Sequence, residues 1–238
     1  MALAATRAGL TQPFLADYFG DPLAERQMQA AAHGSDAAIF DAWAYLLPVL
    51  LRADHFTVCS NPQRFALLGQ LGAAGRLNQH TCGRNLVDVC PQGLSYESRL
   101  EPAGVFHLRG EVVPREAVVV LFLGGYNTWL DEENLFLALE ETLARDPAVH
   151  FVSTGGALGG HVTVTFERFQ RRVAESRYRE RYHFLGWVPL SQIGDICGES
   201  DIAINLDRWS LEAELGLRTR LYAWMRNGGM IDDEYDDS

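Results

Sequence analysis

Apolar and polar residues along the chain follow two alternating periods. Short runs of β-branched and large apolar residues indicate buried strands, and longer stretches with apolar residues three and four apart indicate helices. In the first half, the pattern predicts strands over 14–18, 55–60 and 85–91 and helices from residue 22, over 36–51 and over 62–75. In the second half, it predicts strands over 118–123, 149–153, 182–188 and 201–206 and helices over 132–145, 165–176, 190–197 and 212–226. This alternation predicts an α/β fold with largely parallel sheets that carry helices on both faces.

Residues 94–116 interrupt the alternation with two prolines, two glycines and mixed charge, which indicates a linker between domains. We therefore predict a first domain over 1–93, a domain crossing over 94–116 and a second domain over 117–231. The last residues, 232–238, contain five acids in seven positions and predict a solvated, disordered tail. A chain of 238 residues that is 47% apolar can bury the core of one large domain or of two small ones.

The run from Val118 to Leu123 ends in Gly124 and Gly125, and a helix is predicted from Asp131 onward. In open α/β sheets such a turn lies at the carboxyl end of a strand, where ligands bind, and the start of the following helix offers free N–H groups to an anion. Glycine at such a turn equally serves close packing alone. Both interpretations stay open on the residues themselves.

The charge of the chain narrows the class of partner. A formal net charge of -11 and a pI near 5.0 disfavour nucleic acid and anionic membranes, so the predicted partner is small or neutral. The longest apolar stretch, Ala42 to Leu51, is too short to span a bilayer. The start of the chain shows no signal-peptide pattern, so we expect no transmembrane segment and a cytoplasmic location.

The cysteines do not indicate a metal site. Cys59, Cys82, Cys90 and Cys197 form no CxxC pair, and we expect reduced, partly buried thiols. His80 lies near two of them, but no fourth ligand has suitable spacing, so no metal is predicted. A Rossmann dehydrogenase is disfavoured because no GxGxxG follows a predicted strand.

Several stretches, in order, resemble the donor-binding domain of retaining, nucleotide-sugar-dependent glycosyltransferases of the two-Rossmann-domain (GT-B) type, close to glycosyltransferase family 4. They are LFLGGYNTWLD, FVSTGGALGGH, RYHFLGWVPLSQI, SDIAINLD and EAELGLRTRLYAWMRNGG. The earlier stretches LADYFGDPLAERQ, RADHFTVCSNPQRFALLGQLGAAGRL and LVDVCPQGL resemble the last part of the acceptor-side domain. The resemblance spans most of the chain.

This resemblance implies two Rossmann-like, parallel-sheet halves and transfer of a sugar from a nucleotide sugar to an unidentified acceptor. It implies a hexosyltransferase of polysaccharide biosynthesis that acts with retention of configuration and needs no metal or other cofactor. It also implies that both halves are incomplete, because the early strands of the acceptor-side domain would precede residue 1 and the last part of the donor-binding domain would follow residue 231.

The resemblance implies a donor-binding site on two loops. A sugar nucleotide presents a base, a ribose, a diphosphate and a sugar, so its site needs backbone groups, phosphate donors and acids for hydroxyls. The expected diphosphate and sugar contacts are Gly124, Gly125 and Asn127, and the expected base contacts are Gly186, Trp187 and Val188. For Trp187, packing between the domains is an equally good interpretation.

Four charged residues complete the implied site. Glu212 and Glu214 fall where the family places catalytic acids that contact donor-sugar hydroxyls, although acids in a first helical turn are also favoured by the helix dipole. Arg218 and Arg220 are two apart and point in different directions from a helix. We therefore expect one of them to reach the diphosphate and the other to form a structural ion pair.

Two departures from the family pattern support a second interpretation. Ala223 stands where the family has a ribose-binding acid, and YNTWLD replaces a basic pair after the first glycine turn. The alternative function is a non-catalytic, glycosyltransferase-like binding or assembly module that needs a partner chain. We also expect the apolar side of the last helix, with Leu217, Leu221 and Trp224, to be partly uncovered, which predicts a homo-oligomer or a partner chain through the C-terminal half.

Overall fold

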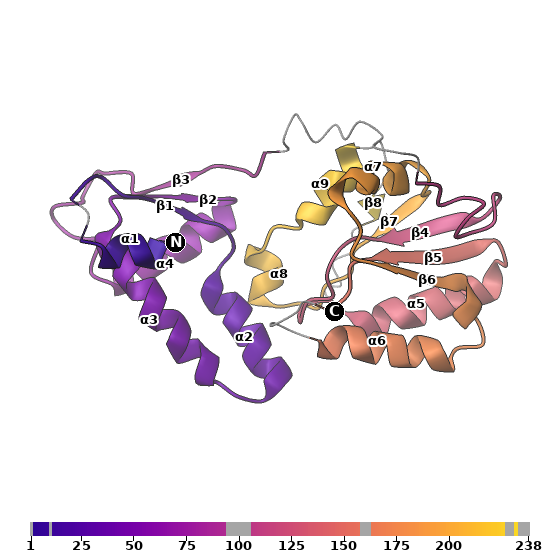
Figure 1. Ribbon diagram of the computed structural model, residues 1–238. Helices are drawn as coiled ribbons and strands as arrows, with labels where there is room; N and C mark the ends of the chain where they lie inside the picture. The colour runs from indigo at the N-terminus through magenta and orange to yellow at the C-terminus, as the bar shows by residue number, and fades with distance from the viewer. Residues whose placement is uncertain (1, 10, 94–105, 158–162, 227–230, 233–238) are drawn as a thin grey trace. The chain divides into compact units, whose positions relative to one another are not determined.

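The computed structural model describes residues 2–9, 11–93, 106–157, 163–226 and 231–232, which form two compact units (Figure 1). The first unit comprises Met1–Gly93 and Ser210–Leu217, and the second comprises Leu94–Trp209 and Arg218–Ser238. Each unit contains one sheet, and all strand pairs in both sheets are parallel. No helix among the described residues is long and apolar enough to cross a membrane.

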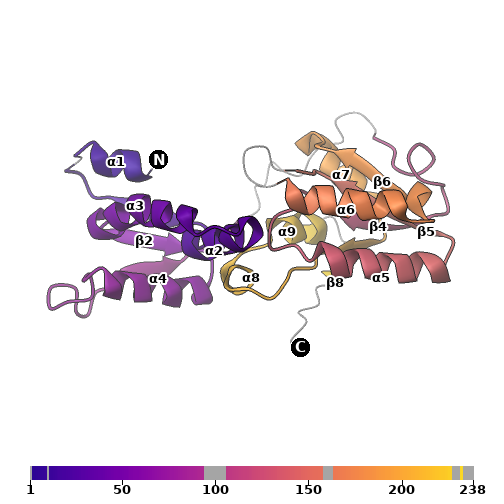
Figure 2. The same ribbon diagram turned by 90° about the horizontal axis from the view of Figure 1, so that it is seen from below.

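The first unit is a three-stranded sheet, ordered β1-β2-β3, between helices. Figure 2 shows α3 and α4 on opposite sides of β2. Phe56 and Val58 on the central strand are fully buried and pack in one cluster with Leu50, Leu67 and Leu71 from these two helices. The strands are β1 (Leu15–Tyr18), β2 (His55–Val58) and β3 (Val87–Val89), and the helices are α1 (Ala2–Arg7), α2 (Pro22–His33), α3 (Ala37–Arg52) and α4 (Asn61–Ala73).

Helix starts in this unit follow from local sequence. Asp21 precedes α2, and its carboxylate accepts hydrogen bonds from two backbone N–H groups of the first turn, with Pro22 in the first helical position. Ser60 caps α4 in the same way, through a hydrogen bond from the backbone N–H of Gln63. These caps explain why the predicted helix starts agree closely with the observed ones.

The second unit is a five-stranded sheet, ordered β6-β5-β4-β7-β8, with α5 and α6 on one face and α7 and α9 on the other (Figure 1). On β4, Val120 and Phe122 join the core under α5 and α6, whereas Val119 and Leu121 join the core under α7 and α9. The sequence of a strand that is buried on both faces is a continuous run of apolar residues. The α/β class with two parallel sheets is therefore confirmed.

The elements of the second unit from β4 to β7 alternate along the chain as the pattern predicted, whereas β8 was not predicted. The strands are β4 (Val118–Phe122), β5 (Val149–Thr154), β6 (Tyr182–Gly186), β7 (Ile202–Ile204) and β8 (Ile231–Asp232). The helices are α5 (Glu132–Arg145), α6 (Val164–Glu175), the short 3₁₀ turn Arg179–Arg181, α7 (Leu190–Gly198) and α9 (Thr219–Arg226).

The helix predicted over 212–226 is wrong, because two helices occupy this stretch. The first, α8 (Leu211–Leu215), ends at Gly216, whose backbone is extended (φ -74°, ψ 160°). Glycine is a poor helix former because it loses the most backbone freedom on folding. α8 contacts α2 and α4 of the first unit, and its last carbonyl, on Leu215, accepts a hydrogen bond from the buried amide of Gln63.

The prediction that the apolar side of the last helix is partly uncovered is also wrong for its largest residue, Trp224. Trp224 is 1% exposed and packs in the core under α7 and α9. β7 is not a sheet edge, because β8 pairs with it at Ala203 and Ile204. The self-association predicted from an open face thus loses its main support. The predicted tail residues 233–238 and residues 94–105 of the predicted linker lie outside the described part of the chain.

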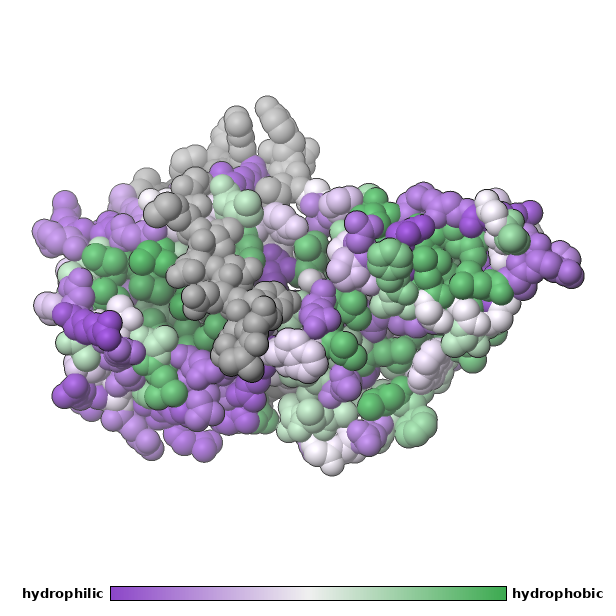
Figure 3. Space-filling model, turned by 180° about the vertical axis from the view of Figure 1, so that it is seen from behind, coloured by the Kyte–Doolittle hydropathy of each residue, from purple (hydrophilic) through white to green (hydrophobic). Residues whose placement is uncertain are grey.

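Large apolar side chains also lie at the surface of each unit, and Figure 3 shows hydrophobic residues interspersed with hydrophilic ones. The most exposed are Phe40 (76%) and Phe65 (66%) in the first unit and Leu190 (69%) and Trp209 (66%) in the second. Scattered apolar side chains are normal on protein surfaces.

Two histidines form a contact pair across β5 and β6. His150 Nδ1 lies 3.0 Å from His183 Nε2, and the two rings stack with their centroids 5.3 Å apart. Burial lowers the pKa of both imidazoles; for His150 the nearby Arg181 adds to the effect, and for His183 the neighbouring His150 does. The folded protein therefore favours the neutral form of the pair.

We expect the free energy of unfolding to fall as the pH drops below the ordinary histidine pKa of about 6.5. Above that pH both the folded and the unfolded chain hold these histidines neutral, and below it the unfolded chain binds protons that the fold excludes. In the double variant His150→Gln/His183→Gln, the free energy of unfolding measured with urea should depend less on pH between pH 5 and pH 7. The exposed His33→Gln serves as control and should leave the slope unchanged.

Candidate functional site

Glycines end three neighbouring strands at the carboxyl edge of the second unit's sheet. Gly124 follows β4 (φ 89°), Gly155 follows β5 (φ 74°) and Gly186 ends β6 (φ 68°). Glycine adopts these left-handed conformations at no steric cost. The turns also bond to one another, since the Gly155 N–H donates to Gly186 O at 2.6 Å and the Gly124 N–H donates to Thr154 Oγ1 at 3.1 Å. We call residues 124–125, 155–156 and 186 the glycine edge.

The glycines of this edge serve two different purposes. A Cβ on Gly155 would lie 2.3 Å from Gly124 O, and a Cβ on Gly156 would lie 3.3 Å from the ring of Phe166. A Cβ on Gly124 or Gly186 would meet no atom of the described residues within 4 Å. Gly155 and Gly156 are therefore packing glycines, whereas Gly124 and Gly186 border open space that a ligand can enter.

The two packing glycines were missed as site residues by the sequence reasoning. The available signal was the second adjacent glycine pair, which follows the β5 run in FVSTGG just as the first pair follows β4. Repetition of this pattern on neighbouring parallel strands places both pairs at one edge of the sheet.

Gly155→Ala should destabilise the second unit by about 2–4 kcal/mol, because the new methyl group collides with a backbone carbonyl and the backbone stays in a left-handed conformation. At Gly198, the last residue of α7, an added Cβ would meet no described atom outside its own helix backbone within 4 Å, so Gly198→Ala should change stability by no more than about 1 kcal/mol. Urea unfolding of both variants measures the difference. Equal stabilities would contradict the close backbone approach.

A buried tyrosine holds the turn after β4 in place. Tyr126 is fully buried, its hydroxyl shares a 2.8 Å hydrogen bond with Ser153 Oγ, and its backbone N–H donates to Gly156 O at 3.1 Å. Its ring packs against Phe122 and the phenylalanines of α6, and burial raises the pKa of its hydroxyl. Asn127 follows at a half-buried position, where its carbonyl accepts a hydrogen bond from the Leu130 N–H.

The two arginines take different positions. Arg220, in the first turn of α9, donates from Nη2 to Gly125 O at 3.1 Å, and its guanidinium lies 4.7 Å from the centre of the Phe122 ring. Arg218 lies just before α9 and donates from Nε to Asp207 Oδ2, with its guanidinium 5.5 Å from the centre of the Trp129 ring. The structure thus places a cation at the glycine edge and a second one in an ion pair.

The chain's own acids lie at the start of the helix after Gly124 and Gly125, which favours the packing interpretation of that turn for α5. The carboxylate of Asp131 caps α5 by accepting from the Asn134 N–H at 3.1 Å, and two glutamates follow in its first turn. Glu132 is 2% exposed and lies between Arg168 (2.8 Å) and Arg208 (2.7 Å). The chain's own acids therefore occupy the positive end of α5.

The start of α9 has the opposite character. It has no acid in its first turn, and it carries Arg220 there with Arg218 one residue before the helix. Positive charge, a helix N-terminus and the open Gly124 turn therefore come together at the carboxyl end of β4. An anion is favoured at α9 rather than at α5.

Glu132→Gln should lower the free energy of unfolding by about 2–4 kcal/mol, because it removes the charge that two arginines share around a buried carboxylate. Its neighbour Glu133 pairs with Arg172 at 3.0 Å, but its side chain is 54% exposed. Glu133→Gln should therefore cost under about 1 kcal/mol. Urea unfolding compares the two, and a Glu132→Gln variant as stable as Glu133→Gln would show that the buried pairs do not stabilise the fold.

The loop after β6 carries the expected base contacts. Trp187 is 62% exposed, and its Nε1 donates to Ala157 O at 3.4 Å. Val188 is half-buried and packs on the core under α7 and α9. Gly186, the glycine of this edge at the end of β6, is therefore followed directly by an exposed aromatic ring.

The expected acids lie on α8, which packs in the first unit. Ser210 caps this short helix by accepting a hydrogen bond from the Ala213 N–H at 3.0 Å. Glu212 is buried, at 5% exposure, and Glu214 is exposed. Ala223, on α9, packs on the core of the second unit. The sugar-binding role of the two glutamates remains a prediction.

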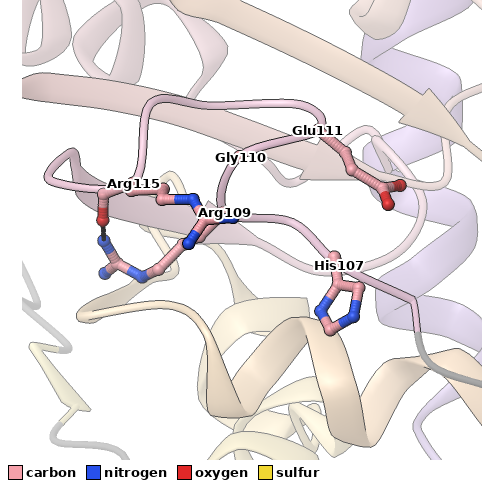
Figure 4. Close-up of a pocket in the computed structure, with 5 residues that line it drawn as sticks. All are labelled: His107, Arg109, Gly110, Glu111 and Arg115. Carbon is pink, nitrogen blue, oxygen red and sulfur yellow. Dashed lines mark hydrogen bonds between the residues drawn. The ribbon is translucent and has the colours of Figure 1, made fainter.

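A separate pocket of about 390 Å³ lies at the opposite, amino edge of the same sheet (Figure 4). Arg109 spans it by donating to Asp201 Oδ2 (2.6 Å), Glu199 O (2.9 Å) and Arg115 O (3.1 Å). These bonds fasten the segment before β4 to the start of β7, so we assign them a structural role. The lining residues are His107, Arg109, Gly110, Glu111 and Arg115.

Across the described residues, no three His, Cys, Asp or Glu side chains gather where they could hold a metal ion. The four cysteines are free thiols. Cys59 and Cys197 are buried, and burial raises the pKa of the Cys197 thiol to about 12. Cys82 and Cys90 are exposed, which differs from the partly buried positions expected for most of them.

No protein-family model and no curated protein sequence matches this chain. Solved structures do match it. HepE from Anabaena, in complex with UDP and glucose, is 18% identical, with a TM-score of 0.66 over 98% of this chain and 55% of that one. Sucrose-phosphate synthase from Thermosynechococcus elongatus is 17% identical, with a TM-score of 0.66 over 97% of this chain and 52% of that one.

Trehalose-6-phosphate synthase, OtsA, is 12% identical, with a TM-score of 0.67 over 98% of this chain and 54% of that one. The chain spans about half the length of each of these three proteins. Identities this low establish the fold alone. The chain has the GT-B fold, with two Rossmann-like halves, as the family resemblance of the sequence implied.

Proposed function

We propose that this chain transfers a sugar from a nucleotide-sugar donor to an acceptor, as a retaining, metal-independent hexosyltransferase similar to glycosyltransferase family 4. The observation that carries the proposal is the glycine edge, where Gly124 and Gly186 border open space and Arg220, at the start of α9, donates to the carbonyl of Gly125. A neutral or cationic ligand would gain little binding free energy from this positively charged site, whereas the negative charge of a diphosphate is complementary to it.

In the proposed reaction, the oxygen of the acceptor hydroxyl bonds to the anomeric carbon, the nucleoside diphosphate leaves with the electrons of the broken C–O bond, and the hydroxyl proton passes to an oxygen of the leaving diphosphate. Negative charge therefore grows on the diphosphate in the transition state. Arg220 and the backbone of Gly124 and Gly125 are proposed to stabilise this charge, while Arg218 stays paired with Asp207; stabilising charge that develops in the transition state is where electrostatic catalysis has its largest effect.

The remaining contacts follow the resemblance. Asn127 is proposed to lie near the diphosphate, and the backbone of Gly186 and Val188, beside the exposed ring of Trp187, is proposed to hold the base. Glu212 and Glu214 are proposed to contact the hydroxyls of the transferred sugar. UDP and its glucose conjugate are the first probes, because structures of HepE contain UDP with glucose or UDP-glucose.

A second candidate function is a non-catalytic module that binds a nucleotide or assembles with a partner chain. Ala223 favours it, because this position of α9 carries no carboxylate and packs on the core. The two candidates differ in turnover, not in fold.

A nucleoside diphosphate should stabilise the fold by about 2.7 kcal/mol at a hundredfold excess over its dissociation constant. A thermal-shift screen of UDP, GDP, ADP and dTDP, each with and without the attached glucose, measures this. A melting temperature that none of them raises would sink the donor-binding proposal. Repeating the screen with EDTA checks metal independence, since a shift that EDTA abolishes would overturn it.

A measurement of turnover then distinguishes the two candidate functions, an enzyme and a non-catalytic binding module. With the binding donor, Glu214→Gln should keep the thermal shift caused by the nucleoside diphosphate and should lower release of sugar from the donor at least about tenfold. The control Glu141→Gln changes an exposed acid on α5 and should leave the rate as it was. A wild-type chain that binds the donor without consuming it, with or without simple sugar acceptors, would favour the module.

A further inference from the structure

The loop after β7 is joined to the loop after β4 at the carboxyl edge of the sheet. The Asp131 N–H donates to Leu206 O at 3.0 Å, and the Arg208 N–H donates to Trp129 O at 2.7 Å. Residues 205–208 therefore continue the glycine edge on its β7 side. The sequence reasoning assigned no function to them.

A polar cluster lies in this loop. Asn205 Nδ2 donates to Asp207 Oδ2 at 3.2 Å, and the same oxygen accepts the hydrogen bond from Arg218 Nε. From the described residues, no hydrogen bond reaches the other carboxylate oxygen, Oδ1. We call Asn205, Asp207 and Arg218 the Asp207 cluster.

The amide of Asn205 is the second observation that points to a ligand. Asn205 is 3% exposed, and its Oδ1 is a buried acceptor that finds no donor in the described part of the chain. Thr128, in the loop after β4, is 6% exposed, and its buried hydroxyl oxygen also has no hydrogen-bond partner among the described residues. Buried polar atoms without partners are uncommon because each one destabilises the fold, so their occurrence on the two joined loops calls for a functional reason.

The chemistry of the open atoms selects the ligand. Asn205 and Asp207 are two residues apart and bond to each other, so their side chains lie on the same side of the loop. Each presents an oxygen that can only accept. A pair of neighbouring O–H donors satisfies both, whereas a cation would be repelled by the guanidinium of Arg218 bound to Asp207.

We propose that Asn205 and Asp207 bind two neighbouring hydroxyls of the donor nucleotide, on its ribose or on its sugar ring, while Arg218 holds Asp207 in place. This proposal rests on the proposed function. The Asp207 side chain is 13% exposed, so the ligand contacts it first. Contact with the buried Asn205 oxygen requires the loop to shift, and the proposal includes this shift. Asp207 then selects donors by their hydroxyls.

The first test changes the ligand and leaves the protein intact. Calorimetry measures the dissociation constants of UDP, GDP and ADP and of their 2′-deoxy forms with the full wild-type chain. If the cluster binds the ribose hydroxyls, the ribonucleotide with the highest affinity should bind at least about tenfold more tightly than its deoxy form. A hydrogen bond to a charged group contributes enough binding free energy for such a difference.

The second test changes Asp207. Asp207→Asn should weaken the ribonucleotide about tenfold and its deoxy form far less, which attributes the difference to this carboxylate. If the cluster reads the sugar instead, the variant should weaken UDP-glucose, GDP-glucose or ADP-glucose about tenfold relative to the matching diphosphate. Asp201→Asn is the matched control, because Asp201 also pairs with an arginine, Arg109 at 2.6 Å, at the opposite edge of the sheet.

Asn205→Ala provides a second variant that leaves the pair of Asp207 and Arg218 in place, in case Asp207→Asn does not fold. Ligands that bind the wild type but show no dependence on hydroxyls, Asp207 or Asn205 beyond the control would overturn this inference alone. A wild type that binds no nucleotide at all would overturn it together with the proposed function.

Discussion

The close approach of Gly155 to the carbonyl of Gly124 is the constraint on which the candidate site depends. With 2.3 Å between that carbonyl oxygen and the position of a Cβ, no other residue type fits without displacing backbone. The approach lets the turn after β5 bond to β6 and lets Tyr126 reach both Gly156 and Ser153. A site that must stabilise charge benefits from such rigidity, because dipoles that are already oriented need no rearrangement during the reaction.

Electrostatics then divide this edge into regions of opposite sign. The first turn of α5 is filled by acids that serve its own N–H groups and two neighbouring arginines, whereas the start of α9 concentrates positive charge. Asp207 lies between the two, because it faces Leu130 of the loop before α5 and binds Arg218 before α9. The side chains that accept hydrogen bonds and those that carry positive charge are therefore separated along a single edge of the sheet.

Much of the fold could be predicted because its signals are local. The unbroken apolar run of β4 reflects burial on both faces, and the caps at Asp21 and Ser60 mark helix starts. The two-residue strand β8 has no period to detect, and the break at Gly216 comes where α8 packs against α2 and α4, contacts that no local pattern in the sequence reveals. Propensity is a weak signal where tertiary contacts decide.

The candidate site was predictable in its glycines and arginines and not in its acids. Gly124 and Gly186 follow apolar runs, and the spacing of Arg218 and Arg220 implied different partners. The carboxylate that pairs with Arg218 lies eleven residues earlier in the chain, on another loop, and its unoccupied oxygen depends on where Asn205 and Arg218 bond. Pairings of this kind follow from the three-dimensional path of the backbone and leave no periodic pattern.

The path of the chain also determines how the two units can be separated. The polypeptide leaves the first unit after Gly93, returns to it for Ser210–Leu217 and leaves again at Arg218, so three covalent connections join the units. A single protease cut in any one of them leaves the halves tethered. A fragment that stops at residue 93 lacks α8 and with it the carbonyl that Gln63 binds, so gene fusions or circular permutants that preserve both units must carry this eight-residue excursion with the first.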